Sequence, residues 1–390
     1  MENFSAKEGF FVITGIICEY NPLHLGHKKQ LDVIRKADPE GSIVCLMSGN
    51  YVQRGQPAII DKSIRAENAV KAGADLVLEL PVGGCLSSAE GFATEGVRIL
   101  SAICDRLCFG AETADEKKLM ETAKALISSE FSEKLVAQMD GGASYPAACQ
   151  AALEQMGVGG ELLRKPNDIL AVEYCKAILK QNVSMGIMPI CRQGDYHDAI
   201  PDRENPSATA VRELMLSGGP WQDYVPEASV LSQGVLHTLE QGEKAILARL
   251  RTMTDEEFES LPYGSEGLWR KLMHNARKGS SLAEILDAVK SKRYPRTRLD
   301  RMVMCAFLGL TAEHIKTPAP YVRVLAFNDK GRQILRDSKE KITLVNAGEV
   351  VADPYQELET RCGRLYGLFA EQPEPADPEK DRRVRYIQLK

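Results

Sequence analysis

The 390-residue chain lacks features that mark several common protein classes. Its 54 acidic residues outnumber its 49 lysines and arginines, which gives a formal net charge of −5. A generally basic nucleic-acid binder is therefore excluded, and any polyanion must meet a local patch. The only strongly apolar stretch near the start, residues 10–18, is about half as long as a membrane span. We expect a buried strand there and no contact with a membrane.

The cysteines lack the spacing of metal sites. There are ten, scattered without a C-x-x-C pair. Cys104 and Cys108 lie closest together and have no neighbouring His or Cys to complete a zinc shell. This usage predicts a reduced, cytoplasmic protein. A hydrophobic content of 44% is enough for a substantial core, and we find no internal repeat.

The first half of the chain reads as an α/β domain with a Rossmann-like parallel sheet. Short β-rich runs alternate with helical patterns over residues 10–217, as in parallel strands joined by crossover helices. The expected strands are residues 11–18, 42–47, 76–80, 106–109 and 183–191. Ligands of such sheets bind beyond the carboxyl ends of the strands, so we look for chemistry in those loops.

The pattern becomes helical after Pro220. Residues 228–250, 267–276 and 282–289 look amphipathic, which predicts a mainly helical domain over residues 221–316. Residues 321–327 and 341–345 read as short strands flanking a helix, in a small α/β extension over residues 317–390. Within it, the acidic segment 371–379 reads as a linker.

The first informative motif is Glu19-Tyr-Asn-Pro-Leu-His-Leu-Gly-His27, where the first strand should give way to a helix. Unpaired amides and the helix dipole attract anions at such a junction. Gly26 lets a nucleotide approach the backbone, and His24 and His27 can donate hydrogen bonds to phosphoryl oxygens. Taken alone, the motif also fits ordinary polar loop residues. Two histidines supply too few ligands for a metal.

The second motif is Asn205-Pro-Ser-Ala-Thr-Ala-Val-Arg212. Ser207 can cap a helix whose first turns carry Thr209 and Arg212 inward. The forked guanidinium of Arg212 is suited to neutralise a β- or γ-phosphate. The alternative is a routine capped helix with a surface arginine.

Together, H-x-G-H after the first strand and S-x-T-x-x-R on a late helix resemble the nucleotidyltransferase α/β phosphodiesterase superfamily. Five further loops narrow the match. They are Met47-Ser-Gly-Asn-Tyr-Val-Gln-Arg-Gly55, Gly73-Ala-Asp-Leu-Val-Leu-Glu-Leu-Pro81, Cys108-Phe-Gly-Ala-Glu112, Lys165-Pro-Asn-Asp168 and Arg192-Gln-Gly-Asp-Tyr-His-Asp198. With them, the chain is similar to the bacterial tRNA(Met) cytidine acetate ligase family from residue 11 to about 310.

The resemblance implies that ATP and acetate give acetyl-adenylate, whose acetyl group passes to N4 of the wobble cytidine in elongator tRNA(Met). It implies catalytic roles for His24, His27 and Arg212. The implied ATP contacts are Ile17, Cys18, Glu19, Tyr20, Asn21, Pro22, Leu23, His24, Leu25, Gly26, His27, Lys28, Lys29, Gln30, Gly110, Asn167, Arg192, Gln193, Ser207, Thr209 and Arg212. We expect Mg²⁺ to bridge the triphosphate, held largely by phosphate and water.

Several of these positions also have a simpler interpretation. Gly110 can let a purine or ribose pack closely, while Asn167 can contact nucleotide edges or merely form a turn after a proline. The family commonly has a second Asn where Asp168 stands, which leaves that position without an assigned role. Asn50, Gln53 and Arg54 lie in a loop that should overhang the site, either as an acetate pocket or as structural ties.

A tRNA substrate requires a surface for a polyanion, and residues 290–301 are the best candidate. Six basic residues meet one acid there, and such a patch can bind phosphate although the whole chain is acidic. Tyr294 can stack on an unpaired base. The alternative is a solvated helix start. Lys271, His274, Arg277 and Lys278 can extend the surface, and residues 381–385 are a weaker candidate.

Two functions from other classes share these features. A small-molecule adenylyltransferase of cofactor biosynthesis needs both phosphate motifs but not the helical domain. A non-catalytic, nucleotide-dependent RNA binder would bind tRNA without consuming ATP. The sequence leaves the oligomeric state open.

Overall fold

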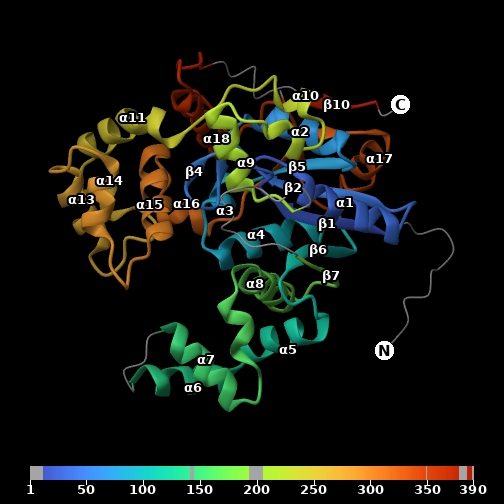
Figure 1. The fold of residues 1–390 in the computed structure, drawn as a ribbon. Helices are drawn as coiled ribbons and strands as arrows, with labels where there is room; N and C mark the ends of the chain where they lie inside the picture. The colour runs from blue at the N-terminus through green and yellow to red at the C-terminus, as the bar shows by residue number, and fades with distance from the viewer. Residues whose placement is uncertain (1–11, 141–144, 193–204, 348, 377–383, 389–390) are drawn as a thin grey trace.

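A computed structural model describes residues 12–140, 145–192, 205–347, 349–376 and 384–388. One eight-stranded sheet lies at its centre (Figure 1), with strand order β10-β8-β5-β2-β1-β6-β7 and with β9 paired to β8. The strands are β1 Ile13–Cys18, β2 Ser42–Ser48, β5 Leu76–Leu80, β6 Arg106–Ala111, β7 Gly186–Cys191, β8 Val322–Phe327, β9 Leu344–Asn346 and β10 Arg385–Tyr386.

The predicted α/β class is confirmed. Strands β5, β2, β1, β6 and β7 run parallel in that order, and they are the five strands expected from the apolar runs. Strand β7 begins at residue 186 rather than 183, and β6 ends at residue 111 rather than 109. Residue 11, the expected start of β1, lies outside the described residues.

Helices cover both faces of the sheet, because successive strand residues point to opposite sides. In β1, Ile17 packs with the helices α4 (Ala89–Leu100) and α8 (Pro166–Gln181), while Ile16 and Cys18 pack with α1 (Leu25–Ala37) and α2 (Lys62–Lys71). The carboxyl ends of the parallel strands therefore meet at one edge, between these layers. That edge also carries the hairpin β3 (Tyr51–Val52) and β4 (Gln56–Pro57) and the short helix α3 (Val82–Cys85).

A helical excursion separates β6 from β7. It contains α5 (Glu116–Leu126), α6 (Ser129–Asp140), α7 (Tyr145–Gln155) and η1 (Gly160–Arg164), and it protrudes from one end of the molecule (Figure 1). Its own core is small and is built around Phe131 and Leu153. The alternating strand and helix pattern did not distinguish this excursion from an ordinary crossover.

A second helical lobe follows α9 (Ala208–Ser217) and η2 (Trp221–Tyr224). It consists of α11 Leu239–Thr252, α12 Asp255–Glu259, α13 Leu268–Ala276, α14 Leu282–Val289, α15 Arg296–Leu308 and α16 Ala312–Lys316. Two of the three predicted helices are confirmed as α13 and α14. The prediction of one helix over residues 228–250 is wrong, because α10 (Ala228–Leu231) and α11 are separate and the N–H of His237 donates to the carbonyl of Ile59 between them.

The end of the chain returns to the central sheet. Strand β8 pairs antiparallel with β5, and β10 pairs parallel with β8, with α17 (Asp329–Asp337) between β8 and β9. The predicted strand 341–345 is present only in part, because β9 begins at residue 344 and ends at residue 346. Helix α18 (Pro354–Tyr366) and η3 (Gly367–Phe369) pack into the core of the helical lobe instead. Residues 371–376 form no helix or strand, and the rest of the predicted linker lies outside the described residues.

None of the helices in the described ranges is both long and apolar enough to cross a membrane. All ten cysteines are free thiols, and only Cys191 among them is exposed.

Candidate active site

The loop after β1 leads directly into α1, where two histidines form the helix cap. His24 is the N-cap residue, and its Nδ1 accepts a hydrogen bond from the N–H of Gly26 at 3.1 Å. The Nδ1 of His27 accepts from the N–H of His24 at 3.3 Å. Because both Nδ1 atoms accept, the proton of each neutral ring lies on Nε2. Each imidazole thus retains an Nε2–H that can donate to a phosphoryl oxygen.

Burial keeps both imidazoles uncharged. Desolvation, assisted by the charges of Arg192 and Arg212, lowers the pKa of His24 to about 3. Desolvation also lowers the pKa of His27 well below its usual value, with His24 and Arg192 acting in the same direction. The two rings stack with centroids 3.8 Å apart. The site therefore offers neutral donors at the positive end of a helix.

The two predicted phosphate motifs meet in space. Ser207 is the N-cap of α9, and its Oγ accepts from the N–H of Ala210 at 3.1 Å. A Cβ on Gly26 would lie only 3.8 Å from the carbonyl oxygen of Pro206, so the N-termini of α1 and α9 converge. The Nζ of Lys29 donates to Oδ1 of Asn205 at 3.0 Å across this junction. Two helix N-termini at one place favour an anion with several negative charges.

Arg212 belongs to this junction. Its Nη1 donates to the carbonyl of Asn21 at 2.8 Å, and its Nη2 donates to Oγ1 of Thr209 at 3.1 Å. The guanidinium is thus fixed between the β1–α1 loop and α9. Both residues were expected to face inward, but Arg212 is half-buried and Thr209 is exposed.

A third group of predicted residues lies where β6 and β7 end. The Nη1 of Arg192 donates to Oδ1 of Asn167 at 3.2 Å. A Cβ on Gly110 would lie 2.7 Å from the Cδ of Arg192. Gly110 therefore makes room for this arginine, which is a different reason from the expected close approach of a purine or ribose. Gln193 lies outside the described residues.

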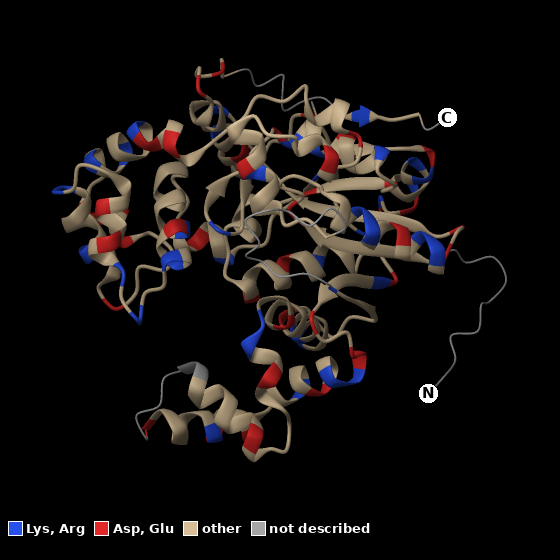
Figure 2. Cartoon of the chain, viewed as in Figure 1, with Lys and Arg blue, Asp and Glu red and all other residues tan. Residues whose placement is uncertain are grey.

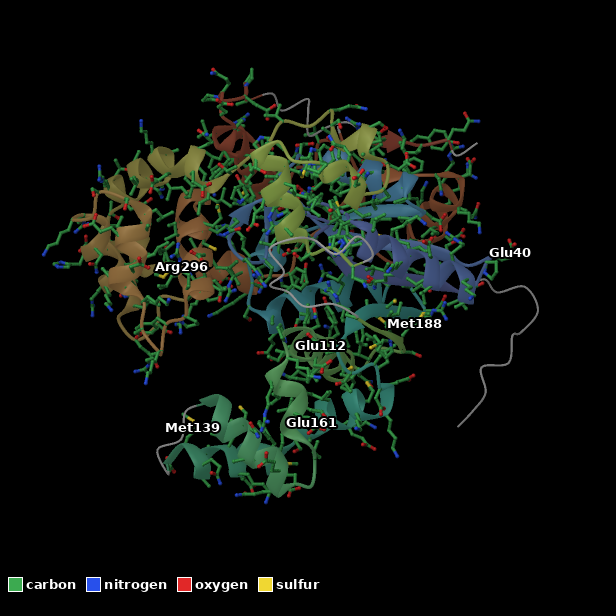
Figure 3. The ribbon with its side chains drawn as sticks, in the orientation of Figure 1. Glu40, Glu112, Met139, Glu161, Met188 and Arg296 are labelled. Carbon is green, nitrogen blue, oxygen red and sulfur yellow. The ribbon has the colours of Figure 1, made fainter. Side chains whose placement is uncertain are left out.

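Glu112, just beyond β6, organises this group, and sequence reasoning did not select it (Figure 3). Its Oε1 accepts from Nδ2 of Asn167 at 2.7 Å, and its Oε2 accepts from the N–H of Asp168 at 2.8 Å. A carboxylate can only accept, so it turns the amide nitrogen of Asn167 toward itself and the oxygen toward Arg192. In the sequence, Glu112 is only the last residue of the motif Cys108-Phe-Gly-Ala-Glu112, which does not indicate this role.

Asp168, which had no assigned role from the sequence, is fully buried, and its side chain binds the backbone just after β6. Its Oδ1 accepts from the N–H of Thr113 at 2.8 Å. Its Oδ2 has no hydrogen-bond partner among the described residues. The side chain therefore links α8 to the end of β6.

The implied ATP contacts between residues 17 and 30 divide into two kinds. Ile17, Tyr20 and Leu23 have side chains buried in the core, so only their backbone can reach a ligand. Lys28 forms an ion pair with Asp32. The accessible side chains of this segment therefore lie mainly at the start of α1, from residue 25 to residue 30.

Two of the three overhanging loop residues are structural ties. Oδ1 of Asn50 accepts from the N–H of Lys62 at 2.8 Å. Nε2 of Gln53 donates to the carbonyl of Ser87 at 3.0 Å, while its N–H donates to Oε1 of Glu19 at 2.8 Å. These contacts fix the hairpin over the edge of the sheet. They leave Arg54, at its tip, as the exposed member of the three.

Arg65 holds the same loops from beneath, and no sequence pattern predicted this role. It is fully buried and donates to the carbonyls of Glu19 at 2.6 Å and Ser48 at 3.2 Å, with a further bond to Gly49. Burial lowers the pKa of its guanidinium. The ends of β1 and β2 are therefore joined by one buried cation.

The basic segment 290–301 lies at the start of α15, in the helical lobe (Figures 2 and 3). Part of it is used inside the protein. Arg296 pairs with Asp300 at 2.8 Å, and Arg298 donates to the carbonyl of Tyr263 at 2.7 Å while lying over the ring of Tyr294. The outward-facing residues are Lys290, Lys292 and Arg293.

Comparison with known proteins agrees with this arrangement. The family description HIGH Nucleotidyl Transferase matches residues 11–381. A tRNA(Met) cytidine acetate ligase from Clostridium novyi is 36% identical over 85% of this chain and 88% of its own length. One from Listeria monocytogenes is 35% identical over 91% of this chain and 94% of its own.

Two solved structures of TmcAL from Thermotoga maritima have the same fold. The apo form superposes with a TM-score of 0.87 at 28% identity, covering 97% of this chain and all of that one. The form bound with alpha-thio ATP has a TM-score of 0.85 at 29% identity, with the same coverage. The chain belongs to the tRNA(Met) cytidine acetate ligase family of HIGH nucleotidyl transferases.

Proposed function

We propose that this enzyme activates acetate with ATP as acetyl-adenylate and transfers the acetyl group to N4 of the wobble cytidine of elongator tRNA(Met), forming N4-acetylcytidine. The observation that carries the proposal is the convergence of the N-termini of α1 and α9 around His24 and His27, with Arg192 and Arg212 beside them. The names of the relatives and the nucleotide bound in one of them support it.

The first step needs charge stabilisation rather than a protein nucleophile. An acetate oxygen attacks the α-phosphorus, the bond from that phosphorus to the bridging oxygen breaks, and pyrophosphate leaves. The Nε2–H groups of His24 and His27 donate to phosphoryl oxygens, and the N-termini of α1 and α9 hold the negative charge. Arg212 neutralises the β- and γ-phosphates. Asn167 and Arg192 hold the rest of the nucleotide.

The second step converts the mixed anhydride into an amide. The N4 amine attacks the acetyl carbonyl carbon, the bond to the adenylate oxygen breaks, and AMP leaves while the nitrogen loses a proton. AMP is a far better leaving group than the oxide that a bare carboxylate would have to expel. Activation is therefore required before an amine of low basicity can be acetylated.

Mg²⁺ would enter with the nucleotide and offset the charge of its phosphates. Within the described ranges, no three His, Cys, Asp or Glu side chains are grouped so as to hold a metal ion. The side chains assigned to the triphosphate, His24, His27 and Arg212, are neutral or cationic, which fits an ion held by phosphate and water.

We assign different roles to the three parts of the chain. Residues 10–217 provide the ATP site and residues 221–316 the tRNA surface, with Lys290, Lys292 and Arg293 as its outermost charges. Strands β8, β9 and β10 complete the central sheet, and α18 and η3 complete the core of the helical lobe. Tyr294 is covered by Arg298, so stacking on a base would require that arginine to move.

A pyrophosphate-exchange assay tests the proposal. The protein should exchange labelled pyrophosphate into ATP only when acetate is present, and it should then acetylate a tRNA(Met) transcript at the wobble cytidine, as seen by mass spectrometry of the digested RNA. A transcript with uridine at that position should remain unmodified. Exchange that depends on a phosphorylated cofactor precursor would make the enzyme a small-molecule adenylyltransferase. Binding of tRNA without ATP consumption would contradict catalysis.

A further inference from the structure

The order of strands in the central sheet gives the two sides of the site different neighbours. Strand β1 lies in the middle, with β6 and β7 on one side and β2 and β5 on the other. Asn167 and Arg192, which we assign to the nucleotide, lie where β6 and β7 end. The β3–β4 hairpin follows β2, and a Cβ on Gly55 in this hairpin would lie 2.5 Å from the backbone nitrogen of Arg301 in α15. The helical lobe therefore meets the sheet on the β2 side (Figure 1), and a tRNA bound to the lobe approaches the site from that side.

Glu19 is held by contacts on this side of the site. It directly follows β1, and its backbone carbonyl accepts from the buried guanidinium of Arg65 at 2.6 Å. Its Oε1 accepts from the N–H of Gln53 in the hairpin at 2.8 Å. Two residues further along the same loop, the carbonyl of Asn21 accepts from Arg212. The carboxylate is therefore fixed between the phosphate-binding loop and the hairpin.

The second carboxylate oxygen of Glu19 is open to a ligand. Oε2 makes no hydrogen bond within the described ranges, and it is not one of the enclosed atoms that lack a partner there. Two other acids near the ends of the parallel strands are already paired. Glu79 forms an ion pair with Lys62 at 3.0 Å, and Glu112 accepts N–H groups at the start of α8. Glu19 thus has one oxygen that fixes its orientation and one that can accept from a substrate.

We infer that Glu19 binds the exocyclic amine of the wobble cytidine through Oε2 and accepts its proton during acetyl transfer. The inference rests on the proposed function, because it names the residue that meets N4 in the second step. The N4 amine carries two hydrogens and a carboxylate can only accept, so the two groups are complementary. Unpaired bases of an RNA loop expose this edge to a protein.

Proton removal by Glu19 completes the second step. The N4 nitrogen forms a bond to the acetyl carbonyl carbon, the bond from that carbon to the adenylate oxygen breaks, and AMP leaves with the electron pair of that bond. The acylated nitrogen then carries one proton too many, which passes to Oε2 of Glu19 and from there to water. A positioned base of this kind contributes about 100-fold to 10,000-fold in rate.

The same contact distinguishes cytidine from uridine. Uridine has a carbonyl oxygen where cytidine has its N4 amine, and a carbonyl oxygen facing a carboxylate is a pair of acceptors without a proton between them. A wobble uridine therefore loses the hydrogen bond and leaves Oε2 unpaired in the complex.

Glu19→Gln tests the inference with little change in shape. The N–H of Gln53 should hold the new amide by its oxygen, so the hairpin keeps its contact while Oε2 is replaced by an NH₂ donor. Acetyl transfer from preformed acetyl-adenylate to tRNA(Met) should fall about 100-fold, whereas acetate-dependent pyrophosphate exchange should fall about threefold or less.

Glu213→Gln on α9 is the matched control. Burial lowers the pKa of Arg212, and the charges of Glu19 and Glu213 both oppose this effect. Glu213 is exposed, so its replacement removes a similar charge without removing an acceptor from the hairpin side. Both rates should remain near those of the wild type. An equal loss of transfer in the two variants would make Glu19 only a charge that acts on Arg212, and would overturn the inference.

Competition between tRNA transcripts gives a second readout, which a purely structural role would not change. Relative to the wild type, Glu19→Gln should shift its preference about tenfold toward a transcript with uridine at the wobble position, because its NH₂ can donate to O4. Equal losses of exchange and transfer would assign Glu19 to ATP instead, and unchanged transfer or an unchanged base preference would also overturn the inference. Failure of the wild-type protein to show acetate-dependent exchange would instead contradict the proposed function.

Discussion

The proposed nucleotide site and the basic surface of the helical lobe both present cations, but they hold them differently. At the nucleotide site Arg192 and Arg212 each donate to a fixed partner, an amide oxygen and a backbone carbonyl. On the lobe, Arg293 pairs with Glu266, and the two side chains are 66% and 49% exposed. Lys290 and Lys292 have no ion-pair partner in the described ranges.

This difference matches two kinds of recognition. A reacting phosphate must be held within a fraction of an ångström, so its ligands are fixed before it arrives. A tRNA backbone can be bound by mobile charges, because its affinity comes from counterion release rather than from fixed geometry. Substitutions at the two regions should therefore have effects of different kind and size.

The largest effect is expected at the cap of α1. His27→Ala should lower the rate of acetyl-adenylate formation by about 100-fold or more, because it removes a donor to the phosphate and the bond that orders His24. Gly26→Val should be as severe, since a Cβ there would already lie 3.0 Å from the ring of His24. Single-turnover adenylation measures the rate, and tRNA affinity should remain near that of the wild type.

His314→Ala provides the matched control for the cap of α1. His314 also completes a capping box, at the start of α16 in the helical lobe. Its loss should leave adenylation unchanged. If His27→Ala forms acetyl-adenylate at close to the wild-type rate, the histidines serve only as a helix cap.

A smaller effect on the same site is expected from Glu112→Gln. The glutamine amide can donate as well as accept, so Asn167 would no longer be forced to turn its oxygen toward Arg192. We expect kcat/KM for ATP to fall about tenfold to 100-fold, with the melting temperature nearly unchanged. Glu161→Gln, in the helical excursion (Figure 3), is the control. An unaltered kcat/KM with lower stability would make Glu112 a purely structural cap of α8.

The sequence predicted one of these regions better than the other. Strands β1, β2 and β5 were visible because parallel strands buried on both faces are continuous apolar runs. The two phosphate motifs were visible because helix N-termini need particular caps. Glu112 and Arg65 were not, because their roles depend on loops brought together from different strands. Pairing of β8 with β5 is likewise a contact between residues far apart in the chain, which local patterns do not encode.

The helical lobe also showed where composition misleads. Counting six bases over residues 290–301 treated them alike, yet Arg296 and Arg298 bind acceptors of the protein itself. A helix predicted over residues 228–250 was broken because the connection before α11 is tied to Ile59. The bonds of Arg298 to Tyr263 and of His237 to Ile59 are tertiary contacts that a linear pattern cannot contain, whereas the pair of Arg296 with Asp300 lies within one helix.

Substitution can separate the exposed cations of residues 290–301 from the arginines of that segment that bind acceptors within the protein. Replacing Lys290, Lys292 and Arg293 with Ala should reduce the salt slope of tRNA binding by about two units, at about 0.7 per phosphate contact. Acetate-dependent exchange should survive. Replacing Arg332, Arg336 and Lys339 on and after α17 is the charge-matched control. An unchanged slope in the folded triple variant would move the tRNA surface elsewhere, for instance to residues 271–278.

The smallest effect concerns the pH dependence of stability, and it should arise at the nucleotide site. Burial holds the pKa of His24 at about 3 and that of His27 well below its usual value, whereas both titrate near their usual pKa in the unfolded chain. Below about pH 6.5 the unfolded state therefore binds more protons than the folded state, and stability falls as the pH drops. From about pH 7.5 to about pH 5.5 the free energy of unfolding should decrease by about 1 to 3 kcal/mol from these two groups.

Urea unfolding at both pH values measures the change. In a variant with His24→Asn and His27→Asn, most of this dependence should disappear, leaving the smaller contributions of His237 and His314, whose pKa values burial also lowers. A double variant with the same pH dependence as the wild type would mean that the two imidazoles are not held neutral.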